Sequence, residues 1–258
     1  MNTTNTEFPD RYFGSAPVDT SAKSKDFYQS RLPKYRMKYL IGFINSIPQN
    51  GRVLDLGCGK GKTICLIQAF RPDIQIDACD LTDMRPFLPV GVNFVKCEAG
   101  AAAEFFPAGT YDAIFNEHVI EHIVYPNTMI DACFTLLKSG GRVFIETPNW
   151  TRLFVPFSPL YFWNDYTHIH PYCITAFQRM FMEYGYDPEY VISVSSMDFG
   201  RRFMKLRLED GVVKTGFKAE TPIFKAHESK ARKIFNAMLD LTLHPVMRDI
   251  LIGVAKKP

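Results

Sequence analysis

The stretch that decides the fold is Val53-Leu54-Asp55-Leu56-Gly57-Cys58-Gly59-Lys60-Gly61-Lys62-Thr63. A short run typical of a buried strand leads into three alternating glycines, and a segment with helical spacing of apolar residues follows. Glycine lets the backbone adopt positive φ and approach a ligand closely. The N-terminus of the next helix offers unpaired N–H groups. The stretch therefore predicts a strand, a tight turn and a helix that bind a cofactor carrying a ribose or an anionic group.

Three kinds of cofactor loop compete for this stretch. A phosphate-binding loop ending in Gly61-Lys62-Thr63 needs a glycine five positions before Gly61, where Leu56 stands. A dinucleotide-binding loop starting at Gly57 needs its third glycine at position 62, which is lysine. The third kind, an acidic residue followed by G-x-G-x-G, is matched in full from Asp55 to Gly61. A carboxylate suits a ligand that carries an ammonium and a sulfonium and no phosphate.

In this loop and in four later segments the chain resembles the class I S-adenosylmethionine-dependent methyltransferases. The similarity extends over much of residues 36–190 and is greatest to the small-molecule group that includes ubiquinone- and sugar-methylating enzymes. The later segments are, in chain order, Asp80, Gly109-Thr110-Tyr111-Asp112, Val119-Ile120-Glu121-His122-Ile123 and Leu136–Asn149, which contains Gly140-Gly141.

The resemblance implies S-adenosylmethionine as cofactor and S-adenosylhomocysteine as product. It places Asp80 on the two ribose hydroxyls, which a carboxylate can bind with two acceptor oxygens. It places Glu98 near the adenine, although the chain carries extra residues between Glu98 and Phe106 relative to the family's pattern. The full set of cofactor-binding residues that we expect is Asp55, Gly57, Cys58, Gly59, Asp80, Leu81, Glu98, Ala99, Asn116 and His118.

Working outward from the loop, short apolar runs alternate with helical segments. Such alternation predicts a parallel sheet covered by helices. The expected strands are 52–56, 74–79, 92–96, 111–116, 142–147, 191–194 and 249–255, and the expected helices are 21–47, 62–70, 101–105, 127–137, 174–184 and 228–243. Together with the resemblance, this pattern predicts an α/β fold, a Rossmann-like seven-stranded, mostly parallel sheet with helices on both faces and an antiparallel last strand.

We expect residues 1–50 to form an N-terminal helical cap and residues 51–258 to form the methyltransferase domain. Two insertions are expected in that domain, an aromatic substrate lid at 150–172 and a basic segment at 200–245. Residues 51–200 carry 10 Lys and Arg against 17 Asp and Glu, whereas residues 201–258 carry 13 against 6. An acidic body with a basic C-terminal part suits an anionic acceptor, and a solvated basic face explains the pattern equally well.

The histidines are the candidates for catalysis. His118 follows the fourth predicted strand, at the edge where open α/β sheets bind ligands, so it is a candidate general base or a cofactor-packing residue. Asp165 could orient His168, which could take a proton near neutral pH, and a structural corner is the alternative. Substrate contacts are expected from Trp163, Tyr166, His170, Arg201 and Arg202.

The same segment, His118-Val119-Ile120-Glu121-His122, literally matches H-x-x-E-H, a zinc-peptidase signature that needs a helix. It follows a predicted buried strand and no obvious third ligand comes after it, so we expect no metal. The six cysteines form no C-x-x-C pair. No apolar run reaches the length of about 18 residues that a membrane span needs, and the N-terminus has no signal pattern. These features predict a cytoplasmic protein.

The function that we expect is methyl transfer from S-adenosylmethionine to a hydroxyl of a small molecule, a sugar or a lipid-linked intermediate. N-methylation of a small molecule is the nearest alternative. A noncatalytic scaffold of the same fold, or a membrane or nucleic-acid binder that uses the basic C-terminal part, stays open as a further alternative. The expected partner is a small-molecule acceptor, and the basic C-terminal part suits an anionic one. We expect no nucleic-acid partner and no integral membrane contact.

Overall fold

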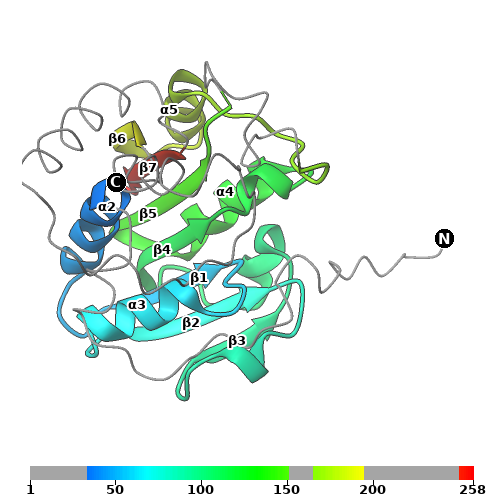
Figure 1. Cartoon of the computed structure of the whole chain (residues 1–258). Coiled ribbons are helices and arrows are strands. Elements are labelled where there is room, and N and C mark those ends of the chain that lie inside the picture. The colour runs from blue at the N-terminus through cyan, green and yellow to red at the C-terminus, as the bar shows by residue number, and fades with distance from the viewer. Residues whose placement is uncertain (1–33, 151–164, 195–249) are drawn as a thin grey trace, which may run out of the picture.

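The structure is a computed structural model, and it describes residues 34–150, 165–194 and 250–258. Its strands form one seven-stranded sheet in the order β3-β2-β1-β4-β5-β7-β6 (Figure 1). The strands are β1 (Arg52–Leu56), β2 (Gln75–Asp80), β3 (Asn93–Lys96), β4 (Tyr111–Glu117), β5 (Leu137–Pro148), β6 (Asp187–Val194) and β7 (Ile250–Lys256). The helices are α2 (Lys34–Asn45), α3 (Lys62–Phe70), α4 (Pro126–Leu136) and α5 (Ile174–Glu183), with 3-10 turns η2 (Arg85–Phe87), η3 (Ala99–Glu104) and η4 (Ile120–His122).

The sheet is parallel except around β7. Strand β1 runs parallel to β2 and β4, and β5 runs parallel to β4. Strand β7 is inserted between β5 and β6 and runs antiparallel to both. The chain moves outward from β1 to β3 and then returns to β4, so the strand order reverses between β1 and β4. The predicted fold class is confirmed, and ligands bind at such a reversal, beyond the carboxyl ends of the strands.

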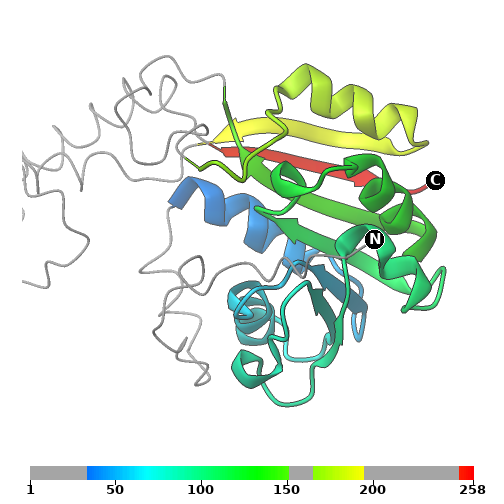
Figure 2. The same ribbon diagram turned by 90° about the vertical axis from the view of Figure 1, so that its right-hand side faces the viewer.

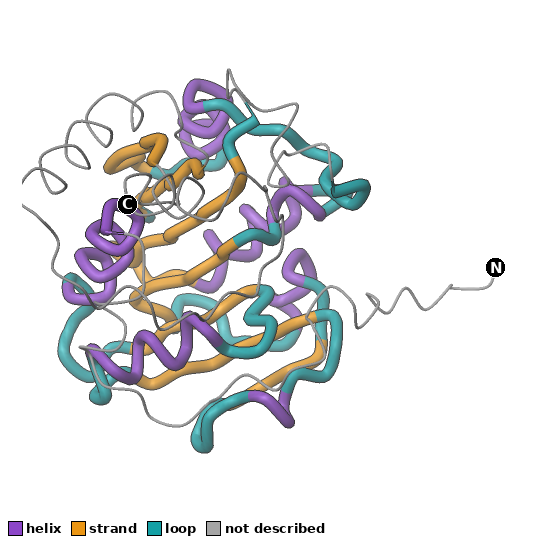
Figure 3. The backbone as a smooth tube through the Cα atoms, viewed as in Figure 1, coloured by secondary structure: helices purple, strands orange, loops and turns teal. Residues whose placement is uncertain are grey.

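Helices cover the sheet on both faces, as the two core clusters show (Figure 2, Figure 3). One cluster joins apolar side chains of α2 and α3 to β1 and β4. The other joins α4, α5 and η3 to the opposite face. Helix α5 lies so close to β7 that a side chain on Gly253 would come within 2.7 Å of the rings of Phe177 and Phe181.

The described part of the expected N-terminal cap belongs to the main core. The side chains of Met37, Leu40, Phe43 and Ile44 in α2 are buried. The ring of Phe43 lies 5.1 Å from that of Phe115 and 5.2 Å from that of Phe144, on β4 and β5. This packing brings the N-terminal turn of α2 to the carboxyl edge of the sheet.

Several predicted boundaries differ from the structure. The helix expected at 101–105 is the 3-10 turn η3, which starts at Ala99. Strand β5 starts at Leu137 rather than at 142, because Leu137 pairs with Tyr111 before an irregularity in the register. Strand β6 starts at Asp187 rather than at 191, because it pairs with β7 from Lys256 onward. The helix expected at 228–243, the basic insertion at 200–245 and residues 151–164 of the lid lie outside the described residues.

Among the described residues, no helix is both long enough and apolar enough to span a membrane.

Candidate active site

The glycine loop between β1 and α3 adopts a backbone that only glycine tolerates well. Gly57 and Gly61 have φ of +78° and +73°. A methyl group at Gly57 would lie 2.3 Å from Cγ2 of Val119, and one at Gly61 would lie 2.7 Å from Cδ2 of Leu88. The backbone N–H groups of Gly57 and Cys58 donate to the carbonyl of Cys79 at the end of β2. The loop is therefore fixed against β2 and leads into the N-terminus of α3, as predicted.

Asp80 at the end of β2 lies directly against this loop. Its Oδ2 accepts a hydrogen bond from the N–H of Gly59 at 2.9 Å, and its Oδ1 accepts one from the N–H of Thr82 at 3.1 Å. Burial raises the pKa of Asp80, and the backbone N–H groups of Thr82 and Gly59 partly oppose that increase. A carboxylate has about four lone-pair sites, so two sites remain for the pair of hydroxyls that the resemblance assigns to it.

Two buried acceptor atoms near the loop have no hydrogen-bond donor in the described structure. They are Oδ2 of Asp55 on β1 and Oδ1 of Asn116 on the neighbouring strand β4. The amide nitrogen of Asn116 donates to the carbonyl of Leu56 at 2.9 Å, which fixes the orientation of its oxygen. Burial, followed by the charges of Glu117 and Asp80, raises the pKa of Asp55 well above its usual value. Unpaired buried acceptors are costly, so this pair fits a ligand that brings a cationic donor, such as an ammonium group.

The residues expected near the adenine lie beside Asp80. The N–H of Cys97 donates to the carbonyl of Asp80 at 3.1 Å, which holds the segment after β3 against the end of β2. Glu98 is exposed and precedes η3, Ala99 begins that turn, and Leu81 is 40% exposed. These side chains border the same edge as the glycine loop, so they are placed where a flat base could lie.

A buried charge network that the sequence did not predict crosses the carboxyl ends of β4 and β5. The guanidinium of Arg36 on α2 binds both carboxylate oxygens of Glu146 through Nε, at 2.7 and 2.6 Å, and also pairs with Glu117. Glu117 accepts a hydrogen bond from Thr63 on α3 at 2.7 Å. The network therefore ties α2, α3, β4 and β5 together. Glu117 ends β4 and Glu146 lies two residues before the end of β5, and these positions were a usable signal. Arg36 lies within an apolar helical pattern that gives no sign of its role.

His118 is engaged by two carboxylates. Its Nε2 lies 3.0 Å from Oε1 of Glu146, and its Nδ1 lies 3.5 Å from Oε1 of Glu121. Desolvation opposes protonation, although the side chain is 43% exposed, and the hydrogen bonds and charges of Glu121 and Glu146 outweigh it and raise the pKa of His118 to about 10. A positive φ of 56°, uncommon for a residue with a side chain, turns the residue at this point. The two carboxylates favour the protonated imidazole, and the general-base and cofactor-packing roles that the sequence suggested for His118 both stay predictions.

His122 and His168 come together, although 45 residues separate them. Their ring centroids lie 4.7 Å apart. Nδ1 of His122 lies 3.2 Å from the carbonyl oxygen and 2.9 Å from Oγ1 of Thr167. Nε2 of His168 lies 3.8 Å from Oδ2 of Asp165, too far for a hydrogen bond. Asp165 accepts hydrogen bonds from the N–H and the hydroxyl of Thr167, and its expected role in orienting His168 stays a prediction.

The remaining expected substrate residues divide into two groups. Tyr166 is 76% exposed, and Nε2 of His170 lies 3.2 Å from the carbonyl of Val124, both in the loop that precedes α5. Trp163, Arg201 and Arg202 lie outside the described residues.

Comparison with known proteins agrees with this geometry. A family model described as a methyltransferase domain matches residues 28–191. The chain belongs to the class I S-adenosylmethionine-dependent methyltransferases. S-adenosylmethionine is accordingly the cofactor of the site, and Asp55, Asn116 and Asp80 offer acceptors that suit its ammonium group and its ribose.

Among curated proteins this methyltransferase is similar to ubiquinone biosynthesis O-methyltransferases. It is 29% identical over 166 residues to that of Xanthomonas axonopodis pv. citri (strain 306), a match that covers 52% of this chain and 66% of the relative. It is 33% identical over 105 residues to that of Paraburkholderia xenovorans (strain LB400), and this match covers 38% of this chain and 44% of the relative. The matches thus span less than two thirds of these relatives.

Among solved structures the fold resembles a SAM-dependent methyltransferase from Archaeoglobus fulgidus, with a TM-score of 0.56, 19% identity and coverage of 90% of this chain and 99% of that one. It also resembles geranyl diphosphate C-methyltransferase from Streptomyces coelicolor A3(2), with a TM-score of 0.57 and 12% identity. This match covers 86% of this chain and 78% of that one. At these identities the likeness supports the fold alone.

Proposed function

We propose that the protein transfers the methyl group of S-adenosylmethionine to a hydroxyl of a small molecule, with a sugar or a lipid-linked intermediate as the acceptor class. The observation that carries the proposal is the pair of unpartnered acceptors, Asp55 and Asn116, beside a glycine loop closed by Asp80. The names of the curated relatives favour oxygen as the acceptor atom.

The chain's own residues bind and orient the two reactants. Asp55 and Asn116 accept hydrogen bonds from the ammonium, Asp80 binds the ribose hydroxyls, and the glycines let the backbone approach closely. S-adenosylmethionine supplies an electrophilic methyl group on a sulfonium. An attacking oxygen must reach that carbon in line, at roughly 3 to 3.5 Å, so positioning is the main task of the protein.

A hydroxyl acceptor must also lose its proton. Glu121 and Glu146 both lie against His118 and favour its protonated form, which disfavours His118 as the group that takes that proton. We therefore assign proton removal to the neighbouring group of Glu121, His122 and His168, called the Glu121 cluster below. In it, burial lowers the pKa of His122, which keeps that imidazole neutral. Replacing His168 by alanine should slow methyl transfer while leaving cofactor affinity near that of the wild type.

N-methylation is the nearest alternative, because an amine acceptor can attack once it is unprotonated. The two are separated by the pH dependence of transfer, since a hydroxyl acceptor needs the base in the Glu121 cluster. If His168→Ala transfers as fast as the wild type over the whole pH range, the assignment of proton removal fails. We also propose that the enzyme is cytoplasmic, because all six cysteines are free thiols, as expected in a reducing compartment. That it has no nucleic-acid partner is a separate part of the proposal.

The experiment that tests the proposal first is a calorimetric titration with S-adenosylmethionine and S-adenosylhomocysteine. Asp55→Ala serves as the control variant, because its side chain provides one of the two unpartnered acceptors. Micromolar binding that Asp55→Ala abolishes supports the site and justifies a screen of hydroxyl and amine acceptors. A well-folded wild type that binds neither compound, alone or with candidate acceptors, refutes the proposal.

A further inference from the structure

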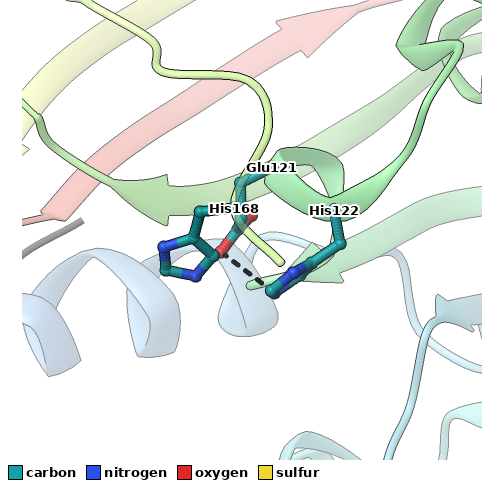
Figure 4. Close-up of side chains that lie close together, drawn as sticks. All are labelled: Glu121, His122 and His168. Carbon is teal, nitrogen blue, oxygen red and sulfur yellow. Dashed lines mark ion pairs between the residues drawn. The ribbon is translucent and has the colours of Figure 1, made fainter. Parts of the chain in front are cut away.

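The Glu121 cluster brings together three side chains that commonly bind metal ions. Glu121 and His122 come from the turn η4 after β4, and His168 comes from the loop before α5 (Figure 4). One ligand atom from each of them lies within 4.8 Å of the other two. Figure 4 shows the three side chains close together, with a dashed line for the ion pair in which Oε1 of Glu121 lies 4.0 Å from Nε2 of His122.

The hydrogen bonds around His122 indicate which of its two ring nitrogens carries the hydrogen. The hydroxyl of Thr167 donates to Oδ1 of Asp165 at 2.6 Å, so it cannot also donate to His122. Nδ1 of His122 therefore donates to Thr167, to the carbonyl at 3.2 Å and to Oγ1 at 2.9 Å. In the neutral ring, Nε2 is then an acceptor. It faces a carboxylate oxygen, which is also an acceptor.

Glu121 is held in place with one oxygen directed at this gap. Its carboxylate is fully buried, and Oε2 accepts a hydrogen bond from Oγ1 of Thr147 at 3.0 Å. Oε1 has no hydrogen-bond partner within the described structure, and its nearest cationic group is His118, 3.5 Å away. His118 also pairs with Glu146, which is the closer carboxylate. A buried carboxylate oxygen that receives no hydrogen bond is stabilised by a cation close to it.

We propose that Glu121, His122 and His168 bind a divalent metal ion of the zinc class. Two imidazoles and one carboxylate are the donor set of several catalytic zinc sites. In a tetrahedral site, ligand atoms that bind one ion at about 2.1 Å lie about 3.4 Å apart. The three ligand atoms here lie within 4.8 Å of one another, so the widest pair must approach by up to about 1.4 Å on binding, a shift that side-chain rotation can supply. Thr147 and Thr167 form the outer hydrogen bonds that orient such ligands.

This site changes the interpretation of the sequence. The H-x-x-E-H pattern suggested His118 and His122 as paired ligands without a third, and we expected no metal. In the structure His118 turns to Glu146, and the third ligand follows 46 residues after His122, in the loop before α5. Three protein ligands leave one position open. Resting on the proposed function, that position suits the acceptor hydroxyl, whose pKa a metal ion lowers. With the ion bound, the cluster promotes proton removal through the metal instead of through an imidazole, and the proton leaves to water.

The test measures metal binding and needs neither an acceptor nor turnover. The full chain, purified without a histidine tag and treated with chelator, is titrated with Co2+ and then with Zn2+. We expect one ion per chain by elemental analysis after dialysis, and cobalt absorption bands that Zn2+ displaces. A wild type that retains no stoichiometric ion overturns the proposal, even if methyl transfer is found.

Variants assign the ion to the cluster. His168→Ala and Glu121→Gln should each weaken Zn2+ binding at least tenfold, because losing even an outer hydrogen bond costs about 10- to 100-fold. His170→Ala is the matched control, since His170 lies two residues from His168 and contacts the carbonyl of Val124 instead. Equal affinity in His168→Ala and the wild type overturns the assignment. Thr167→Val, which keeps all three ligands, should still weaken binding, so the proposal stays testable if Glu121→Gln does not fold.

Discussion

Arg36 offers the sharpest test of how the site is held together. It is the side chain by which α2 neutralises Glu146 and Glu117 at the carboxyl edge of the sheet. Its own side chain is only 10% exposed, and that of Glu146 is 0% exposed. Arg36→Met keeps most of the apolar stem and removes the charge. Glu146 then retains His118 as its one partner among the interactions described above.

The expected loss of stability follows from this burial. Removing one partner of a buried ion pair costs about 3–5 kcal/mol, because the remaining charge is left without compensation. For a domain of this size, 1 kcal/mol shifts Tm by about 2–4 °C. Arg36→Met should therefore lower Tm by about 6–20 °C. Arg36→Met combined with Glu146→Gln should be more stable than Arg36→Met alone, because the second change removes the uncompensated charge.

The measurement is urea denaturation of the wild type, both single variants and the double variant, followed by circular dichroism. An unchanged slope with a lower midpoint identifies a loss of folded-state stability. A loss below about 1 kcal/mol in Arg36→Met, the usual range of an exposed ion pair, contradicts the buried network. The buried network is also contradicted if the losses of unfolding free energy in the two single variants add up to the loss in the double variant, since residues in contact show a coupling energy.

Three further predictions concern the same edge of the sheet. The raised pKa of His118 contributes stability that is fully present below about pH 6.5 and is lost as pH rises through about 10. The Tm of the wild type should therefore fall over this pH range, and the Tm of His118→Gln should lack this contribution. Asp80→Ala should weaken S-adenosylhomocysteine binding at least tenfold by calorimetry, since about 1.4 kcal/mol is the low end for lost hydrogen bonds to a charged group, and unchanged affinity refutes the ribose assignment. Gly57→Ala should abolish cofactor binding because its Cβ would clash with Val119. Gly109→Ala is the control, because Gly109 also has a positive φ, of +61°, but no atom lies near the new methyl group, so this variant shows only the backbone strain of about 1–2 kcal/mol. Similar cofactor affinities in the two variants would refute the role of the clash.

The fold was predictable from the sequence because its strongest signals are local. The glycine loop fixes the end of β1 and the start of α3 within eleven residues, and apolar runs mark the buried parallel strands on both sides of it. Boundaries were wrong where pairing between distant strands extends an element. Strand β6 gains four residues at its start because β7, more than sixty residues later in the chain, offers pairing partners as far as Lys256. No local pattern encodes that length.

The cofactor half of the site was predictable for the same reason. Asp80 ends β2, Gly57 follows β1 directly and Asp55 is the residue before the last of β1, and these positions alone place them at one edge. The buried charges were not predictable. Arg36 reaches a partner 110 residues away, and a pattern of apolar residues in a helix does not distinguish a buried arginine from a solvated one.

The histidines show why a sequence motif has to be interpreted together with its backbone conformation. Read as a helix, H-x-x-E-H puts His118 and His122 on one face. The structure instead ends β4 at Glu117, gives His118 a positive φ and starts a 3-10 turn at Ile120. Those few dihedral angles direct His118 to Glu146 and leave Glu121 and His122 facing the loop that carries His168. The chemistry of this edge is therefore set by one left-handed residue, whose side chain binds two carboxylates that would otherwise repel each other.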